Sequence, residues 1–211
     1  TGEIVAIGRN VKEDFVGKPV TLGDKVVTCI IPCGKCAACK RTPGRSNLCE
    51  RVGVYGLIPD DDIHLNGYFA DHMVIRAGST FFNVSGMSLD QRLLVEPAAV
   101  AIHAVERAKT TGLLTFNAVT LTQGCGPIGL LVIAALRAMG IENIIAIDGN
   151  ASRLGLAKEM GAAHGVNFTE YDDFDSMLKA VKSLNGGFGA DFVFQCTGSA
   201  QAGGKAWKLI R

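Results

Sequence analysis

The sequence has little excess charge of either sign, few aromatic residues and no recognisable leader. It carries 21 Lys and Arg against 20 Asp and Glu, a net charge of +1, and 7% of its residues are aromatic. Proteins that bind nucleic acid or an anionic membrane surface need a clear cationic excess, so this balance argues against both partners. Thr1 is followed by an alternating apolar pattern rather than by a basic segment and an apolar core, which predicts no signal peptide.

No uniformly apolar run is long enough to cross a membrane. Residues 110–136 carry no charge, but Asn117, Gln123, Pro127 and several Thr and Gly interrupt them. A bilayer core would leave such a polar, broken segment unsatisfied. We therefore interpret it as a buried parallel strand, a glycine turn and a buried helix.

The composition predicts a folded chain with a sizeable core. Its 211 residues are 48% hydrophobic and 19% charged, and 26 of them are Gly, which indicates many tight turns. The chain does not begin with Met, and it ends at Arg211 within an apparent helix. We therefore expect it to be a piece of a longer protein.

The pattern of elements changes near Glu96 and Pro97. Before this point we expect short strands at Glu3–Ile7, Lys25–Ile31 and Tyr68–Ile75. After it we expect helices at 98–109, 127–139, 151–160, 174–184 and 202–210, and strands at 118–122, 143–147, 166–168 and 191–195. This alternation predicts an α/β fold, a Rossmann-type doubly wound parallel sheet that is partial because about six strands are usual.

A glycine-rich motif marks the first strand-to-helix turn of this second part. Gly124, Gly126 and Gly129 form G-x-G-x-x-G between an expected strand and an expected helix, with Pro127 and Ile128 in the first helical turn. The first Gly permits the turn, the second leaves room for a pyrophosphate, and the third allows close helix packing. The motif therefore predicts a dinucleotide-phosphate site at a helix N-terminus.

Asp148 ends the next expected strand, where a carboxylate can accept hydrogen bonds from the adenosine ribose. Such an acid repels a 2′-phosphate, so it favours NAD over NADP, although Arg153 lies within reach of the same ribose. The alternative is that the glycines are ordinary turn residues and that Asp148 caps the helix from Ala151.

Four of the seven cysteines form a metal-ligand pattern. Cys33, Cys36, Cys39 and Cys49 are spaced so that three thiolates from a tight loop and one from further along can surround Zn²⁺. A site closed by four thiolates has no position for water and is structural. The remaining thiols, Cys29, Cys125 and Cys196, are expected in the core.

Two alternatives for this cluster stay open. The first three spacings also suit an iron–sulfur cluster, but Cys49 is neither close enough nor followed by Pro. A disulfide pairing would need an oxidising compartment, whereas the odd, clustered cysteine count indicates a reducing one, such as the cytoplasm.

Taken together, these motifs resemble the zinc-containing medium-chain alcohol dehydrogenase family. The resemblance runs through nearly the whole chain and is carried by residues 23–26, the Cys33–Cys49 cluster, 67–71, Glu96-Pro97, 124–129, Asp148 and 196–198. It implies a mostly-β GroES-like catalytic domain at 1–97 with a zinc lobe at 32–50, followed by a Rossmann NAD-binding domain at 98–211, both partial. It also implies oxidation of a secondary alcohol or polyol by NAD, Thr197 among the cofactor-binding residues, and a homodimer or homotetramer.

The resemblance gives Glu96 a role as a late ligand of a catalytic zinc. A Glu-Pro pair at this position is similar to the polyol and threonine dehydrogenase branch. The alternative is that Glu96 caps a helix beginning at Pro97. The family's earlier catalytic ligands are expected just before Thr1, and the gap from Cys39 to Cys49 is two residues longer than is usual in the family.

The four histidines show no ligand spacing. His64, His72, His103 and His164 stand apart, without an H-E-x-x-H pattern, so we expect none of them to bind the catalytic metal. Two other functions are weighed against the dehydrogenase: a non-catalytic nucleotide-binding or structural protein that keeps the fold, and a zinc ribbon for nucleic acid. The charge balance argues against the zinc ribbon.

Overall fold

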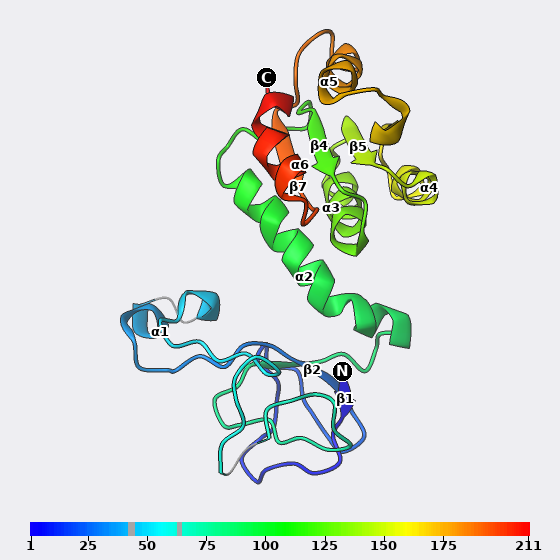
Figure 1. Ribbon diagram of the computed structural model, residues 1–211. Helices are drawn as coiled ribbons and strands as arrows, with labels where there is room; N and C mark the ends of the chain where they lie inside the picture. The colour runs from blue at the N-terminus through cyan, green and yellow to red at the C-terminus, as the bar shows by residue number, and fades with distance from the viewer. Residues whose placement is uncertain (42–44, 63–64) are drawn as a thin grey trace. The chain divides into compact units, whose positions relative to one another are not determined.

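The computed structural model describes residues 1–41, 45–62 and 65–211 of the chain (Figure 1). These residues form two compact units, Thr1–Leu93 and Leu94–Arg211. The two units are described separately below, the second first because it holds the sheet.

The second unit is built on a four-stranded parallel sheet in the order β6-β5-β4-β7. Its strands are β4 (Thr120–Gln123), β5 (Ile144–Asp148), β6 (His164–Asn167) and β7 (Phe192–Gln195). The helices are α3 (Pro127–Ala138), α4 (Ala151–Glu159), α5 (Phe174–Ser183) and α6 (Ala200–Lys205), with 3-10 turns η2 (Phe168–Glu170) and η3 (Ala206–Leu209). The prediction of an α/β fold with a parallel sheet is confirmed, and the strand ends differ from the predicted ones by at most two residues.

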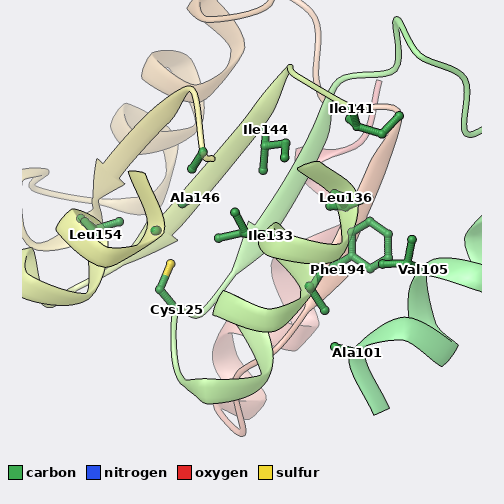
Figure 2. Close-up of a cluster of buried hydrophobic side chains, with 13 residues drawn as sticks. Ala101, Val105, Cys125, Ile133, Leu136, Ile141, Ile144, Ala146, Leu154 and Phe194 are labelled. Carbon is green, nitrogen blue, oxygen red and sulfur yellow. The ribbon is translucent and has the colours of Figure 1, made fainter. Parts of the chain in front are cut away.

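Helices cover both faces of this sheet because successive strand residues point to opposite sides. Ile144 and Ala146 of β5 pack on one side with α3, α4 and two residues of helix α2 (Leu89–Lys109), Ala101 and Val105 (Figure 2). Ile145 and Ile147 pack on the other side, with Met177 and Val181 of α5 and Leu209 of η3. Such two-sided burial explains why these strands are almost continuously apolar.

Helix α2 (Leu89–Lys109) begins nine residues before the predicted start at Ala98. Ser88 and Gln91 form a capping box, in which Gln91 N donates to Ser88 Oγ at 3.2 Å and Ser88 N donates to Gln91 Oε1 at 2.9 Å. Pro97 therefore lies inside the helix. A sequence of the form S-x-x-Q was the missed signal for this start.

The first unit contains a three-stranded antiparallel sheet of β1 (Gly2–Glu3), β2 (Lys25–Thr28) and β3 (Phe81–Asn83). A short helix, α1 (Ala37–Arg41), and a 3-10 turn, η1 (Ser46–Leu48), belong to the cysteine segment. The predicted strand at Tyr68–Ile75 is wrong, because Phe69 and Val74 of this segment are exposed and β2 pairs with Phe81–Asn83 instead. The strand predicted at Glu3–Ile7 is reduced to its first residue.

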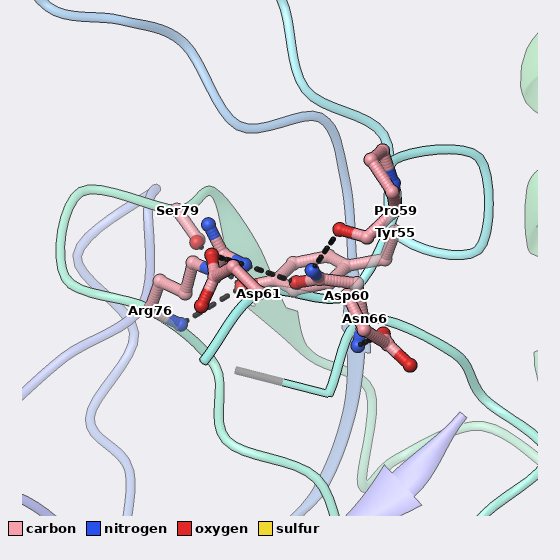
Figure 3. Close-up of polar contacts among 7 residues, drawn as sticks. All are labelled: Tyr55, Pro59, Asp60, Asp61, Asn66, Arg76 and Ser79. Carbon is pink, nitrogen blue, oxygen red and sulfur yellow. Dashed lines mark hydrogen bonds and ion pairs between the residues drawn. The ribbon is translucent and has the colours of Figure 1, made fainter. Parts of the chain in front are cut away.

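Polar contacts hold the loops of the first unit, and some of the groups that make them are buried. Arg76 Nη2 donates to Asp61 Oδ2 at 3.1 Å and also to Asn66 Oδ1, while Arg76 N donates to the hydroxyl of Tyr55 at 2.8 Å (Figure 3). Asn66 is 1% exposed, and its Nδ2 donates to Pro59 O at 2.7 Å. These contacts join residues 55–61 and Asn66 to the turn before β3.

No helix in the described ranges 1–41, 45–62 and 65–211 is long and apolar enough to cross a bilayer.

Candidate functional site

The glycine turn joins the end of β4 to the start of α3, and two of its glycines are required by close packing. Gly124 has φ +95°, and a Cβ on it would lie 3.0 Å from Cys196 O and from Thr197 Cβ. A Cβ on Gly129 would lie 1.9 Å from Gly124 O. The first turn of α3 can therefore approach the end of β4 only because both residues lack a side chain.

The middle glycine is different, because the space beside it is open. A Cβ on Gly126 would meet nothing within 4 Å. Gly126 is the N-cap of α3, Pro127 has no N–H, and no side chain caps this helix start. In the part of the chain that the structure describes, the N–H groups of Ile128 and Gly129 donate to no protein acceptor. Open space in front of free helix N–H groups fits an anionic phosphate group.

Asp148 ends β5 directly beside this turn and is only 9% exposed. Its Oδ2 accepts from Cys125 N at 2.8 Å and its Oδ1 accepts from Asn150 N at 2.9 Å. The carboxylate thus fixes the glycine turn to the end of β5. The helix cap of α4 is Asn150, whose side chain accepts from Arg153 N at 3.1 Å, so the alternative that Asp148 caps this helix is wrong.

Arg153 and Thr197 lie next to Asp148 and the glycine turn, respectively. Arg153 Nη1 lies 4.0 Å from Asp148 Oδ2, and its side chain is 55% exposed. Thr197 follows β7, and its Cβ lies against Gly124. The structure therefore gathers all the predicted cofactor-binding residues at the carboxyl ends of β4, β5 and β7, where ligands of such sheets bind.

Cys125 lies between the first two glycines, and it is a neutral core residue. It is fully buried, and burial, followed by the nearby Asp148 carboxylate, raises the pKa of its thiol to about 12. The thiol therefore carries no charge that would repel a phosphate. Cys196 packs beside it, whereas Cys29 is exposed, so the prediction of a core position is wrong for Cys29.

The four clustered cysteines converge in the first unit. The Sγ atoms of Cys33, Cys36, Cys39 and Cys49 all lie within 4.8 Å of one another. A tetrahedral ion with Zn–S bonds of about 2.3 Å needs sulfur atoms about 3.8 Å apart, so the cluster fits one such ion. Cys36 and Cys39 are 3.4 Å apart at sulfur, which is far longer than a disulfide bond, and all four thiols are free.

The local backbone favours negative sulfur atoms in this cluster. The N–H groups of Lys35 and Cys36 point at the sulfur of Cys33 and lower its pKa to about 6. The N–H groups of Cys39 and Glu50 lower the pKa of Cys36. Loss of hydration and the neighbouring sulfur atoms raise the pKa of Cys39 to about 12. A bound metal cation that replaces the protons of such closely spaced thiols stabilises the negative charge on their sulfur atoms.

The structure does not establish a role for Glu96, the predicted ligand of a catalytic zinc. It lies inside α2 rather than at its start, so the alternative of a cap for a helix beginning at Pro97 is wrong. Its side chain is exposed. Within the described residues, the four cysteines are the one group of three or more side chains that could hold a metal ion. The described residues thus give no geometry for a catalytic zinc.

The histidines do not change this result. His72, His103 and His164 are exposed and join no ligand group in the described part of the chain. His64 lies outside the described residues.

Comparison with known proteins identifies the family of this chain, which carries the glycine turn, Asp148 and the four clustered cysteines. Residues 1–85 match the family model described as "Alcohol dehydrogenase GroES-like domain", and residues 127–211 match "Zinc-binding dehydrogenase". The chain therefore belongs to the zinc-containing medium-chain alcohol dehydrogenase family. The prediction of this family is confirmed.

Particular relatives fall in the predicted branch. The chain is 33% identical to sorbitol dehydrogenase of Bacillus subtilis over 100% of its own length and 54% of the relative. It is 34% identical to L-threonine 3-dehydrogenase of Bacillus licheniformis, over 96% of the chain and 52% of the relative. The crystal structure of an alcohol dehydrogenase from Thermotoga maritima superposes with a TM-score of 0.81 at 30% identity, covering 95% of this chain and 55% of that one. The chain thus spans about half the length of the curated relatives it matches.

Proposed function

We propose that the whole protein is an NAD-dependent zinc alcohol dehydrogenase that transfers a hydride from a secondary alcohol or polyol to the nicotinamide. The observation that carries this proposal is the open space at Gly126 in front of the free N–H groups of α3, with Asp148 beside it. The relatives named above, a sorbitol and a threonine dehydrogenase, support the class of substrate.

The residues of the second unit would hold and orient the cofactor. The N–H groups at the start of α3 would donate to the diphosphate, and Asp148 would accept from the ribose hydroxyls. Because Asp148 also holds Cys125 N, binding of the ribose and the shape of the phosphate turn depend on the same carboxylate. NAD itself supplies the hydride acceptor.

We propose that zinc occupies the four-cysteine cluster as a structural ion that ties a lobe with few buried apolar residues. Glu96 remains our candidate for one ligand of a catalytic zinc. A zinc ion at such a site, when bound, supplies Lewis acidity toward the alcohol oxygen. Glu96 is tested by metal content, because its loss should lower the zinc bound per chain without affecting the cysteine site.

The partners follow from the same proposal. We expect a small-molecule alcohol as substrate, no nucleic acid or membrane partner, and a homodimer or homotetramer. The odd, clustered count of seven cysteines supports work in a reducing compartment such as the cytoplasm. We also keep the division at residue 97 between a GroES-like and a Rossmann domain as a proposal.

The deciding experiment measures formation of reduced nicotinamide by the full-length protein. Polyols, amino alcohols and simple alcohols are supplied in turn with NAD or NADP. We expect absorbance of the reduced cofactor with at least one secondary alcohol and a preference for NAD. Tight NAD binding without turnover of any alcohol class would instead support the non-catalytic nucleotide-binding alternative.

A further inference from the structure

Strand β6 is an edge strand, and in the described residues it pairs with β5 alone. Ile147 O of β5 accepts from Gly124 N at 2.8 Å on the β4 side, so the two neighbours of Ile147 turn their backbone groups toward β6. Val166 lies opposite Ile147 in the register of the two strands. The backbone groups of Val166 therefore face β5, and those of its neighbour Gly165 point away from the sheet.

The outward backbone of Gly165 is open to solvent. Gly165 is exposed, and within residues 1–41, 45–62 and 65–211 no further segment bonds to its N–H or C=O group. Such an edge is a template for pairing with another chain, and proteins commonly protect it with a charged side chain, a proline or a bulge. Strand β6 contains no proline, and its register with β5 is unbroken over all four residues. The nearest side chain is that of Lys158, whose Cε would lie 3.3 Å from a Cβ on Gly165.

The surface on both sides of this edge is hollowed. On the α5 side a hollow of about 330 Å³ is lined by residues that include Tyr171 and Leu184. On the α4 side a hollow of about 350 Å³ is lined by residues that include Leu154. Gly165 and Lys158 line both hollows. Because side chains of a strand alternate between its two faces, a strand added beside Gly165 would direct successive side chains toward the two hollows in turn.

The charges at this edge favour an acidic occupant. In the part of the chain that the structure describes, no carboxylate lies within 4.0 Å of the Lys158 ammonium group. His164 also lines the α5-side hollow, which has no acidic residue, whereas Glu170 lines the hollow on the α4 side. An acidic side chain therefore fits the α5 side, where it would meet Lys158.

A second copy of this chain is a poorer occupant of the same edge. Two copies paired about a two-fold axis at Gly165 would bring the two Lys158 side chains to the same place. Like charges that face each other across paired strands are destabilising. The edge therefore selects against self-pairing and for a different chain that carries a carboxylate.

We propose that the edge of β6 binds an extended segment of another protein as an added strand, with an acidic side chain of that segment in the α5-side hollow beside Lys158. Main-chain hydrogen bonds to Gly165 supply affinity, and the two hollows select the alternate side chains. This interaction goes beyond the dehydrogenase activity and uses none of the residues that we assign to the cofactor.

The test uses the full-length protein and a library of synthetic hexapeptides in which Val or Thr alternates with Glu, Gln or Lys. We expect the Glu peptides to bind at least about tenfold more tightly than the Gln peptides, and the Lys peptides to bind least. Lys158→Gln should remove the preference for Glu over Gln. Fluorescence anisotropy of labelled peptides measures all of these affinities.

A matched pair of variants tests whether the backbone of Gly165 makes the contact. Gly165→Pro removes the outward N–H, and an edge strand tolerates proline where that group faces away from the sheet. Gly165→Ala adds a Cβ at the same place, beside the flexible end of Lys158, and keeps the N–H. We expect the proline variant to lose affinity for the Glu peptides about tenfold or more and the alanine variant to stay within about threefold.

A further measurement on the wild-type protein decides the proposal even if Gly165→Pro does not fold. The amide hydrogen of Gly165 faces solvent, so its exchange should slow at least about tenfold when a Glu peptide is bound. Exchange at Ala135, which lies within helix α3, is the internal control and should not change.

The outcomes separate this surface from the cofactor site. If the wild-type protein binds no peptide of the library, Lys158 serves only to keep the edge unpaired and the proposal is overturned. Equal binding by the proline and alanine variants, or unchanged exchange at Gly165, also overturns it, and equal binding of Glu and Gln peptides overturns the acidic partner. NAD binding, measured in parallel, should be the same in all variants, and its loss in the wild-type protein would overturn the proposed dehydrogenase function but not this surface.

Discussion

Gly129 faces the carbonyl oxygen of Gly124 so closely that a Cβ on it would lie 1.9 Å from that oxygen. The contacted atom is backbone, so no flexible side chain can move aside. We expect Gly129→Ala to separate the start of α3 from the end of β4 and to lower the free energy of unfolding by about 3 kcal/mol. Urea unfolding measures this loss, and a variant as stable as wild type would show that the turn is not packed as described.

Gly126→Ala is the matched change with the opposite expectation. Its Cβ would meet no atom within 4 Å, and its φ of −72° suits any residue, so the free energy of unfolding should hardly change. The methyl group would instead occupy the space left for the diphosphate. We expect NAD affinity to fall about tenfold or more, measured by titration of the cofactor. Unaltered affinity would place the diphosphate elsewhere.

The contrast between these two glycines shows what sequence can predict. The motif itself predicts the turn, the helix after it and the roles of Gly124 and Gly129, because these depend on local backbone geometry. It does not reveal that Cys125 N is held by Asp148, since that bond joins residues 23 apart in the chain. The spacing of the four cysteines likewise predicted a convergence of sulfur atoms that the structure confirms.

The errors have equally specific causes. Residues 68–75 contain Val and Ile, which are common in strands, but a strand needs a partner, and β2 pairs with Phe81–Asn83. Pro97 suggested the first turn of a helix, and the capping box at Ser88 and Gln91 overrides it.

Asp148 should decide between the two nicotinamide cofactors. Its carboxylate repels a 2′-phosphate, so Asp148→Asn should raise the ratio of NADP to NAD affinity about tenfold. The amide has one acceptor oxygen in place of two, so we also expect the hydrogen bond from Cys125 N or the one from Asn150 N to weaken. Dissociation constants for both cofactors measure the ratio. Adding Arg153→Ala to this variant should lower NADP affinity again, and an unchanged ratio in both variants would contradict the placement of the ribose.

If the cysteine cluster binds zinc through four thiolates, zinc binding should require each of the four sulfur atoms. Cys49 is 7% exposed and its sulfur lies 4.0 Å from that of Cys36, so Cys49→Ser should remove one zinc per chain and destabilise the first unit. Cys29→Ser is the control, because Cys29 is exposed and lies outside the cluster. Metal analysis and thermal melting measure both effects. Full zinc content in the Cys49 variant would contradict a four-thiolate site.

Asp14 makes the stability of the first unit depend on pH. Its carboxylate accepts from Lys18 N at 2.9 Å, from Val16 N at 3.0 Å and from Asn83 N at 2.8 Å, which ties the turn at residues 14–18 to β3. Burial by itself would raise the pKa of Asp14, but these three backbone donors outweigh it, and the pKa lies below its ordinary value of 3.8. The folded chain therefore gains stability from the ionised group above that value and loses it as the pH falls through the folded-state pKa.

An amide at position 14 has one acceptor oxygen and no charge, so Asp14→Asn should lower the free energy of unfolding by about 2 kcal/mol near neutral pH. The difference between variant and wild type should shrink once the pH falls below 3.8, because the wild-type carboxylate then takes up its proton. Urea unfolding of both proteins across this range measures the difference, with Asp172→Asn, at an exposed position of the second unit, as the control. A difference that stays constant with pH would mean that Asp14 stabilises this unit by its shape and not by its charge.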